Sequence, residues 1–147
     1  MEWVKPEKEE PQILFHDQEI DFTLSDQEKY QSWILQIIAR QEKECGVINY
    51  IFCDDNYLLE KNQTYLQHDT LTDIITFEYD DNPISGDIFI SIDRVKENAA
   101  QRNLAMESEL HRVMAHGILH LGGYGDKSES EKKTMRTKEE ESMRLLS

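Results

Sequence analysis

Two histidines, two glycines and an aspartate stand close together in the segment HGILHLGGYGD. If the first part is helical, the four-residue spacing of His116 and His120 puts both imidazoles on one face. Gly122 and Gly123 favour the left-handed turn that often ends a helix. The chain can then reverse and bring Asp126 towards the imidazoles. Two imidazoles and a carboxylate are a usable ligand set for zinc, and three protein ligands leave a position for water, as in catalytic sites.

The histidine spacing alone is weak evidence, because two surface histidines on a helix give the same pattern. A second interpretation is that the helix belongs to the core. Apolar or small residues recur at helical spacing beside the histidines, at Leu110, Val113, Met114, Gly117, Ile118 and Leu121. Both interpretations hold if the helix packs by one edge and presents its histidines by the other. His111, His68 and the cysteines are the alternatives to Asp126 as third ligand.

The length and the charge limit the kinds of protein that the chain can be. With 147 residues it is expected to form one domain, preceded by a flexible lead-in over residues 1–11. The formal net charge of −14 argues against a general binder of polyanions. Residues 66–93 contain no lysine or arginine, whereas residues 94–147 contain ten. Contacts with phosphate are therefore expected from the last third of the chain.

The cellular location is predicted from the cysteines and from the lack of targeting and membrane segments. Cys45 and Cys53 have no recognised metal or redox spacing, so two buried, reduced thiols are expected. No signal peptide and no apolar stretch long enough to cross a bilayer is visible. These observations favour a cytoplasmic protein with no membrane partner.

The apolar periodicity and the turn residues predict an α+β fold, with a small mixed sheet and helices packed against it. Ser25 with Glu28, and Ser128 with Glu131, have the spacing of capping boxes at helix starts. Strands are predicted at 13–16, 47–53, 74–79 and 84–91, with a polar turn at 67–73 and a loop at 80–83. Helices are predicted from Ser25 to about residue 45, from about 54 to 62, from Ser91 or Asp93 to about 104, at 107–121, and after Ser128.

Three segments of this chain, in this order, resemble one known family. They are Tyr65 with TDIITF at 72–77, GDI at 86–88 with Ser91, and Glu109-Leu110 followed by HGILHLGGY at 116–124. Together they resemble the bacterial YbeY family of metal-dependent endoribonucleases, which act as ribosomal RNA maturation factors. The resemblance covers most of the chain and is weakest before about residue 50.

The resemblance implies a zincin-like α+β fold, in which the metal site lies near the sheet on a helix ended by the glycine pair. It also implies one zinc ion per chain and single-strand-specific cleavage in the late maturation of small-subunit ribosomal RNA, with a part in ribosome quality control. Two positions depart from the family pattern. Asp126, preceded by Gly125 where an aspartate is common, replaces a third histidine, and Leu66 replaces an arginine thought to serve RNA binding or catalysis.

The hydrolase hypothesis assigns a role to each candidate residue. His116 and His120 would bind zinc as neutral imidazoles, with Asp126 completing the set, and the metal would activate a water molecule towards phosphorus. Asp87 is the candidate general base, although it could instead hydrogen-bond a histidine or cap a strand. The candidate phosphate contacts are Arg94, Lys96, Arg102 and Arg112, each of which could also be solvated helix surface.

Two other functions compete with the nuclease. The histidine spacing suits a zinc peptidase, but Gly117 stands where the H-E-x-x-H pattern has its glutamate base. A partner-binding factor is the other alternative, because the acidic first two thirds suit a basic ribosomal protein or assembly factor. The metal would then serve stability only. DNA is not expected as a partner under any of these hypotheses.

Overall fold

The structure is a computed structural model that describes residues 10–66 and 72–146. Its elements in order are β1 (Gln12–Asp17), α1 (Gln27–Arg40), β2 (Cys45–Cys53), α2 (Asp55–Leu66), β3 (Ile74–Asp81), β4 (Ile84–Ser91), α3 (Ile92–Gln101), α4 (Met106–Leu121) and α5 (Glu129–Arg144). None of these helices has the length and the apolar character that crossing a membrane would require. The predicted lead-in over 1–11 lies almost wholly outside the described residues.

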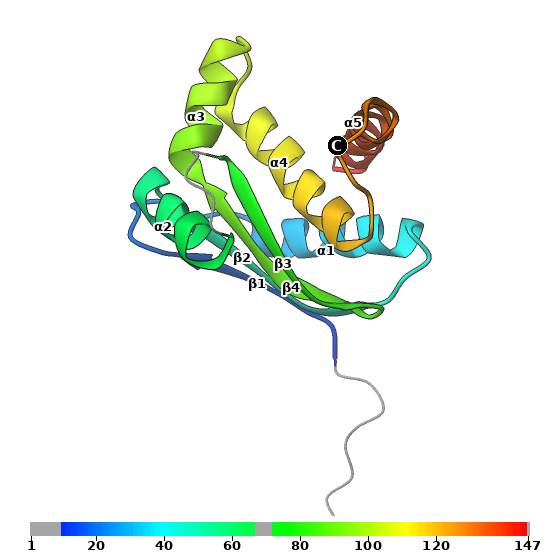
Figure 1. Ribbon diagram of the computed structural model, residues 1–147. Coiled ribbons are helices and arrows are strands. Elements are labelled where there is room, and N and C mark those ends of the chain that lie inside the picture. Colours follow the sequence, from blue (N-terminus) through cyan, green and yellow to red (C-terminus); the bar gives the residue numbers. More distant parts are fainter. Residues whose placement is uncertain (1–9, 67–71, 147) are drawn as a thin grey trace, which may run out of the picture.

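The four strands form one mixed sheet in the order β1-β2-β4-β3 (Figure 1). β1 pairs parallel with β2, β2 pairs parallel with β4, and β4 pairs antiparallel with β3. The predicted α+β class with a small mixed sheet is therefore confirmed. The predicted loop at 80–83 is shorter than expected, because Asp80 and Asp81 extend β3 and pair with Ser85 and Ile84.

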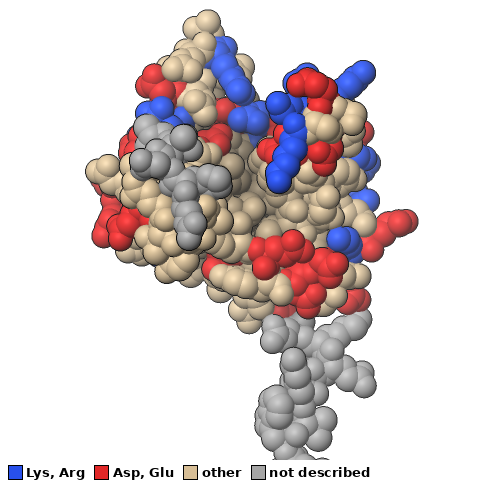
Figure 2. Space-filling model, in the orientation of Figure 1, with Lys and Arg blue, Asp and Glu red and all other residues tan. Residues whose placement is uncertain are grey.

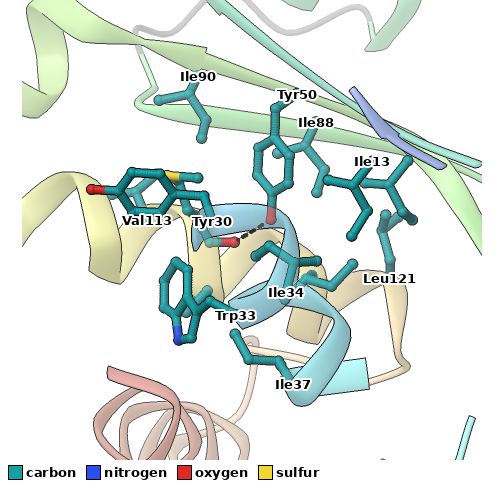
Figure 3. Close-up of a cluster of buried hydrophobic side chains, with 14 of the residues drawn as sticks. Ile13, Tyr30, Trp33, Ile34, Ile37, Tyr50, Ile88, Ile90, Val113 and Leu121 are labelled. Carbon is teal, nitrogen blue, oxygen red and sulfur yellow. Dashed lines mark hydrogen bonds between the residues drawn. The ribbon is translucent and has the colours of Figure 1, made fainter. Parts of the chain in front are cut away.

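Helices cover both faces of this sheet. α1 and α4 pack on one face, where the inward residues of β2 and β4 are apolar and fully buried. Figure 3 shows this core, with Trp33 and Ile34 of α1 below the strands and Tyr50 donating a hydrogen bond to the Met114 carbonyl at 2.8 Å. α2 covers part of the other face with a smaller cluster around Leu58 and Ile75. α4, which carries His116 and His120, therefore lies against the larger core.

The helix ends follow the capping pattern in most places. Ser128 and Glu131 form the predicted capping box of α5, and the Ser91 side chain caps α3. The box predicted at Ser25 is wrong: α1 begins after Asp26, which has a left-handed φ of 55° and makes no side-chain cap. α1 also ends at Arg40, earlier than expected, because the backbone turns before β2.

α4 lies close to the sheet because Gly117 has no side chain. A Cβ atom at this position would lie 2.8 Å from the Ile88 Cγ2 atom of β4. At the other end of the helix, Gly123 takes a φ of 106°, and its N–H donates to the His120 carbonyl at 2.9 Å. The Tyr124 N–H donates to the Leu119 carbonyl at 3.1 Å, which completes the glycine-ended motif. This turn reverses the chain and carries Asp126 back towards α4.

Candidate metal and RNA-cleavage site

His116, His120 and Asp126 converge as the sequence predicts. One nitrogen or oxygen atom from each side chain lies within 4.8 Å of the others. Among the described residues, these three form the one cluster of side chains that could hold a metal ion. The Asp126 Oδ2 atom lies 3.2 Å from His120 Nε2 and 3.5 Å from His116 Nε2. The two imidazole rings stand edge to face with their centroids 4.5 Å apart. One carboxylate oxygen therefore faces the same nitrogen of both rings.

The other nitrogen of each ring has a fixed partner. His116 Nδ1 lies 2.6 Å from Glu139 Oε2, and His120 Nδ1 lies 2.8 Å from the Tyr124 carbonyl oxygen. A carbonyl oxygen can only accept a hydrogen bond, so the His120 proton belongs on Nδ1. A carboxylate partner favours the same tautomer at His116. In the neutral rings, the Nε2 atoms are then the ones with a free lone pair, and both are directed towards Asp126.

This arrangement fits a divalent metal ion. Two nitrogen lone pairs and a carboxylate oxygen that face one point repel one another unless a cation or a proton lies between them. Imidazole and carboxylate are ligands that zinc accepts, and three of them leave a coordination position open. His116, His120 and Asp126 therefore form a site that could hold a metal ion.

A buried ion-pair network supports the first histidine. Arg112 donates to both carboxylate oxygens of Glu109, at 2.7 and 2.9 Å, and to Glu139 Oε1 at 3.4 Å. Glu109 is fully buried and Glu139 is nearly so. The pKa of the Arg112 guanidinium is raised, chiefly by its hydrogen bond with Glu109. Arg112 thus holds Glu139 in place, and Glu139 holds the ring of His116.

The site opens into a cleft of about 820 Å³. Residues 72–76 at the start of β3 form one wall, and Asn62 and Leu66 at the end of α2 border it. The opposite wall is formed by Arg112, Val113, His116 and His120 of α4, with Asp126 and Lys127 after it. Figure 2 shows the hollow in the middle of this face of the molecule. A polymer that lies in the cleft would pass directly over the histidine nitrogens.

Comparison with known proteins identifies the family. The family model described as Endoribonuclease YbeY matches residues 12–147. The chain belongs to the YbeY endoribonuclease family. An endoribonuclease YbeY of Flavobacterium psychrophilum is 53% identical over 91% of this chain and 96% of its own length. One of Porphyromonas gingivalis is 48% identical over 78% of this chain and 76% of its own length.

A solved structure agrees with the fold. A Thermotoga maritima protein, determined in solution, matches with a TM-score of 0.62 and 25% sequence identity, over 91% of this chain and 88% of that one. Members of the YbeY family are named as endoribonucleases, so this chain is a hydrolase of RNA by family. The resemblance seen in its sequence motifs is confirmed over nearly the whole chain.

The predicted role of Asp87 beside the histidines is wrong. Its neighbours Gly86 and Ile88 point towards α4, where they meet Leu121 and the position of Gly117. Because side chains alternate along a strand, Asp87 points to the opposite face of the sheet. There it accepts hydrogen bonds from Asn49 Nδ2 at 3.1 Å and from the Tyr79 hydroxyl at 2.7 Å. It can neither take a proton in the cleft nor hydrogen-bond His116 or His120.

The four predicted phosphate contacts have different surroundings. Arg112 lines the cleft, but it is held by the carboxylates of Glu109 and Glu139. Arg94 pairs with Asp55 through Nε at 3.1 Å. Arg102, which is more exposed, lies 3.5 Å from Glu109. Lys96 is exposed on α3.

The alternative ligands lie elsewhere or outside the described residues. His111 Nε2 pairs with the Tyr30 hydroxyl at 2.8 Å, beside the ring of Trp33, and burial lowers its pKa. Cys45 and Cys53 are free, buried thiols, as predicted, and burial raises their pKa to about 11 and about 12. His68 lies outside the described residues.

Sequence reasoning missed Glu139 and Lys127. Glu139 is a charged residue on the buried stripe of α5, between Met135 and Ser142 at helical spacing. A glutamate in such a stripe needs a buried partner, and that was the available signal. Lys127 follows Asp126 directly and lines the same cleft.

Proposed function

We propose that this chain is a zinc-dependent endoribonuclease that cleaves single-stranded ribosomal RNA late in small-subunit maturation and takes part in ribosome quality control. The observation that supports the zinc site is the convergence of His116 Nε2, His120 Nε2 and Asp126 Oδ2, with both Nδ1 atoms held by acceptors. Because ribosomal RNA is the proposed substrate, we also propose a cytoplasmic location.

When bound, zinc would lower the pKa of a water molecule and neutralise charge on a phosphoryl oxygen. The chain's own residues prepare the site for that chemistry. Glu139 and the Tyr124 carbonyl keep the two rings oriented by accepting hydrogen bonds from their Nδ1–H groups. Asp126 brings one negative charge, so the ligand set keeps a net positive charge with a divalent ion and can attract a phosphate.

The edge strand that borders the cleft favours single-stranded RNA. The border of the cleft on the sheet side is the first residues of β3, an edge strand whose outer backbone groups have no neighbouring strand in the described sheet. Such groups can hydrogen-bond bases that are not already paired. Leu66 borders the cleft where the family usually has an arginine, so this chain offers an apolar contact there.

The test is a cleavage assay with purified protein. We expect cleavage of a labelled single-stranded oligoribonucleotide with the sequence of the small-subunit three-prime end, little cleavage of the same sequence in a duplex, loss with a chelator and recovery with zinc. Zinc content by mass spectrometry should be about one ion per chain. Chelator-insensitive cleavage, or none by the zinc-loaded protein, would refute the proposal.

A second proposal concerns a protein partner. Acidic side chains gather below the hollow in Figure 2, over the β3–β4 hairpin that includes Asp80 and Asp81. A negative surface of this kind suits a basic ribosomal protein or assembly factor. Pull-down with reconstituted ribosomal proteins, compared between the wild-type chain and an Asp80→Asn, Asp81→Asn variant, tests it. Equal recovery with both would contradict a contact at this hairpin.

A further inference from the structure

The positive side chains near the cleft differ in whether they are already paired. Arg112 is bound by Glu109 and Glu139, and Arg102 lies 3.5 Å from Glu109. On the far side of α3, Arg94 is bound by Asp55. A guanidinium that is held by carboxylates has little net charge to offer a phosphate, and breaking a buried pair is costly. Arg112, whose partners are buried, therefore serves the protein's own structure first, and Arg102 and Arg94 are partly neutralised by their carboxylates.

Three other positively charged side chains form no ion pair with a carboxylate of the described residues. Within the part of the chain that the structure describes, no acidic side chain lies within ion-pair distance of Lys127, Lys133 or Arg136. Lys127 lines the cleft beside Asp126, and Lys133 and Arg136 are exposed on α5. We call these three residues the basic flank.

The packing of α5 places this flank on the cleft side. Glu139 faces α4, because it reaches His116. Lys138 and Glu141 face α1, because they line a small pocket with Arg40. Arg136, three residues before Glu139, therefore lies on the flank of α5 that faces away from α1.

That flank borders the open side of α4. On one side of α4, His111 contacts Tyr30 of α1. On another side, Val113 and His120 line the cleft. α5 packs on the surface of α4 between these two sides, where Glu139 contacts His116. Figure 2 shows blue side chains over α3 and over α5 on the two sides of the hollow. Lys127, Lys133 and Arg136 lie on the side over α5, whereas Lys96 is the exposed cation of α3.

We propose that the basic flank is the phosphate-binding track for the single-stranded RNA that extends from the cleft. Lys127 would contact the phosphate nearest the metal site, and Arg136 and Lys133 would contact phosphates further along the strand. This inference rests on the proposed function, because it assumes that RNA occupies the cleft. In a protein of net charge −14, unpaired cations at the cleft give the local attraction that RNA binding needs.

The experiment measures RNA binding by fluorescence anisotropy at several potassium chloride concentrations, with zinc-loaded protein and a labelled single-stranded oligoribonucleotide. We expect Lys127→Gln, and the double variant Lys133→Gln, Arg136→Gln, each to weaken binding about three- to tenfold at low salt. Each lost phosphate contact should reduce the slope of log affinity against log salt by about 0.7.

Lys138→Gln is the matched control, since it removes one positive charge from the same helix on the flank that faces α1. It should bind RNA within about twofold of the wild-type chain, and circular dichroism and zinc content should match for all variants. Equal weakening by Lys138→Gln would overturn the track, because net charge alone would then explain the loss. Wild-type affinity and salt slope in the basic-flank variants, with zinc-dependent cleavage intact, would overturn the track and leave the proposed function standing.

Discussion

The two faces of the sheet each carry a cluster of histidine, aspartate and their polar partners, and the two clusters are built differently. On the outer face, His16 Nε2 lies 2.9 Å from Asn49 Oδ1, Asn49 donates to Asp87, and Tyr79 donates to the other oxygen of Asp87. On the α4 face, two imidazole nitrogens and Asp126 Oδ2 face one another. The first cluster pairs each donor with an acceptor, and the second directs acceptors at one point.

This difference teaches how a reactive site can be told from a structural one. Both clusters contain histidine and aspartate, which are common in catalytic sites. The sequence alone therefore predicts that Asp87 belongs to the site. On the outer face the hydrogen bonds are complete, so an ion has nothing to gain by binding there. On the α4 face the Nδ1 atoms have acceptors, and the Nε2 atoms of the neutral rings face only the Asp126 carboxylate, which is also an acceptor. Convergent acceptors, more than residue type, mark the site.

The largest expected effect comes from removing one histidine of the α4 face. His116→Ala and His120→Ala should each lose most of the bound zinc, because two protein ligands hold zinc poorly. Metal content after gel filtration measures the loss. The matched change on the outer face, His16→Ala, should leave the metal content unchanged. Full zinc in a His116→Ala, His120→Ala double variant would remove the distinction between the faces.

The next effect separates the charge of the third ligand from its donor atom. Asp126→Ala should weaken zinc binding strongly, whereas Asp126→His should retain it, since imidazole replaces carboxylate as a ligand. Competition with a chromophoric chelator gives both affinities. Wild-type affinity in Asp126→Ala would mean that another residue is the third ligand.

A smaller effect is expected from the support of His116. Glu139→Gln keeps a hydrogen-bond acceptor for Nδ1 but removes the negative charge, so zinc affinity should fall about tenfold. The visible spectrum of the cobalt-substituted protein should change as well, because it reports ligand geometry. Glu140→Gln, an exposed neighbour on the same helix, is the control. If both variants bind zinc alike, Glu139 has no influence on the metal.

The smallest effect is expected on the outer face. Asp87→Asn loses the acceptor for Asn49 or Tyr79, which should cost about 1 kcal/mol of stability and leave zinc content and RNA cleavage unchanged.

The hydrogen bond with Asp87 raises the pKa of Tyr79 to about 12. In the Asp87→Asn variant, the pKa of Tyr79 should fall towards its ordinary value of about 10. Ultraviolet titration of the tyrosines measures this change. The raised pKa stabilises the folded protein below about pH 10, and this contribution is lost as the pH rises through about 12. A Tyr79 pKa that does not change in the variant would contradict this account of the outer face.

The sequence predicts well the features that depend on neighbouring residues. The spacing of His116 and His120, the glycine turn and Asp126 are local, so helix geometry was enough to bring them together. The capping box at Ser128 is local too, and it formed as predicted. The box at Ser25 did not, because α1 begins one residue after a left-handed Asp26.

The features that depend on packing between distant elements could be predicted only in part. The face that Asp87 occupies follows from strand alternation once Gly86 and Ile88 are known to be inward, and that depends on where α4 packs. The contact of Glu139 with His116 needs α5 to lie beside α4. Which arginines are neutralised likewise depends on carboxylates of other helices, such as Asp55 for Arg94.

The position of Glu139 has a consequence for the order in which the protein is made. The ligand side chains are complete once residue 126 has been synthesised, but the carboxylate that orients His116 lies in α5, 23 residues after it. Because synthesis proceeds from the N-terminus, a growing chain contains His116, His120 and Asp126 before it contains Glu139. His116 gains this hydrogen bond only after α5 has docked on α4, so a chain still being translated lacks the finished site.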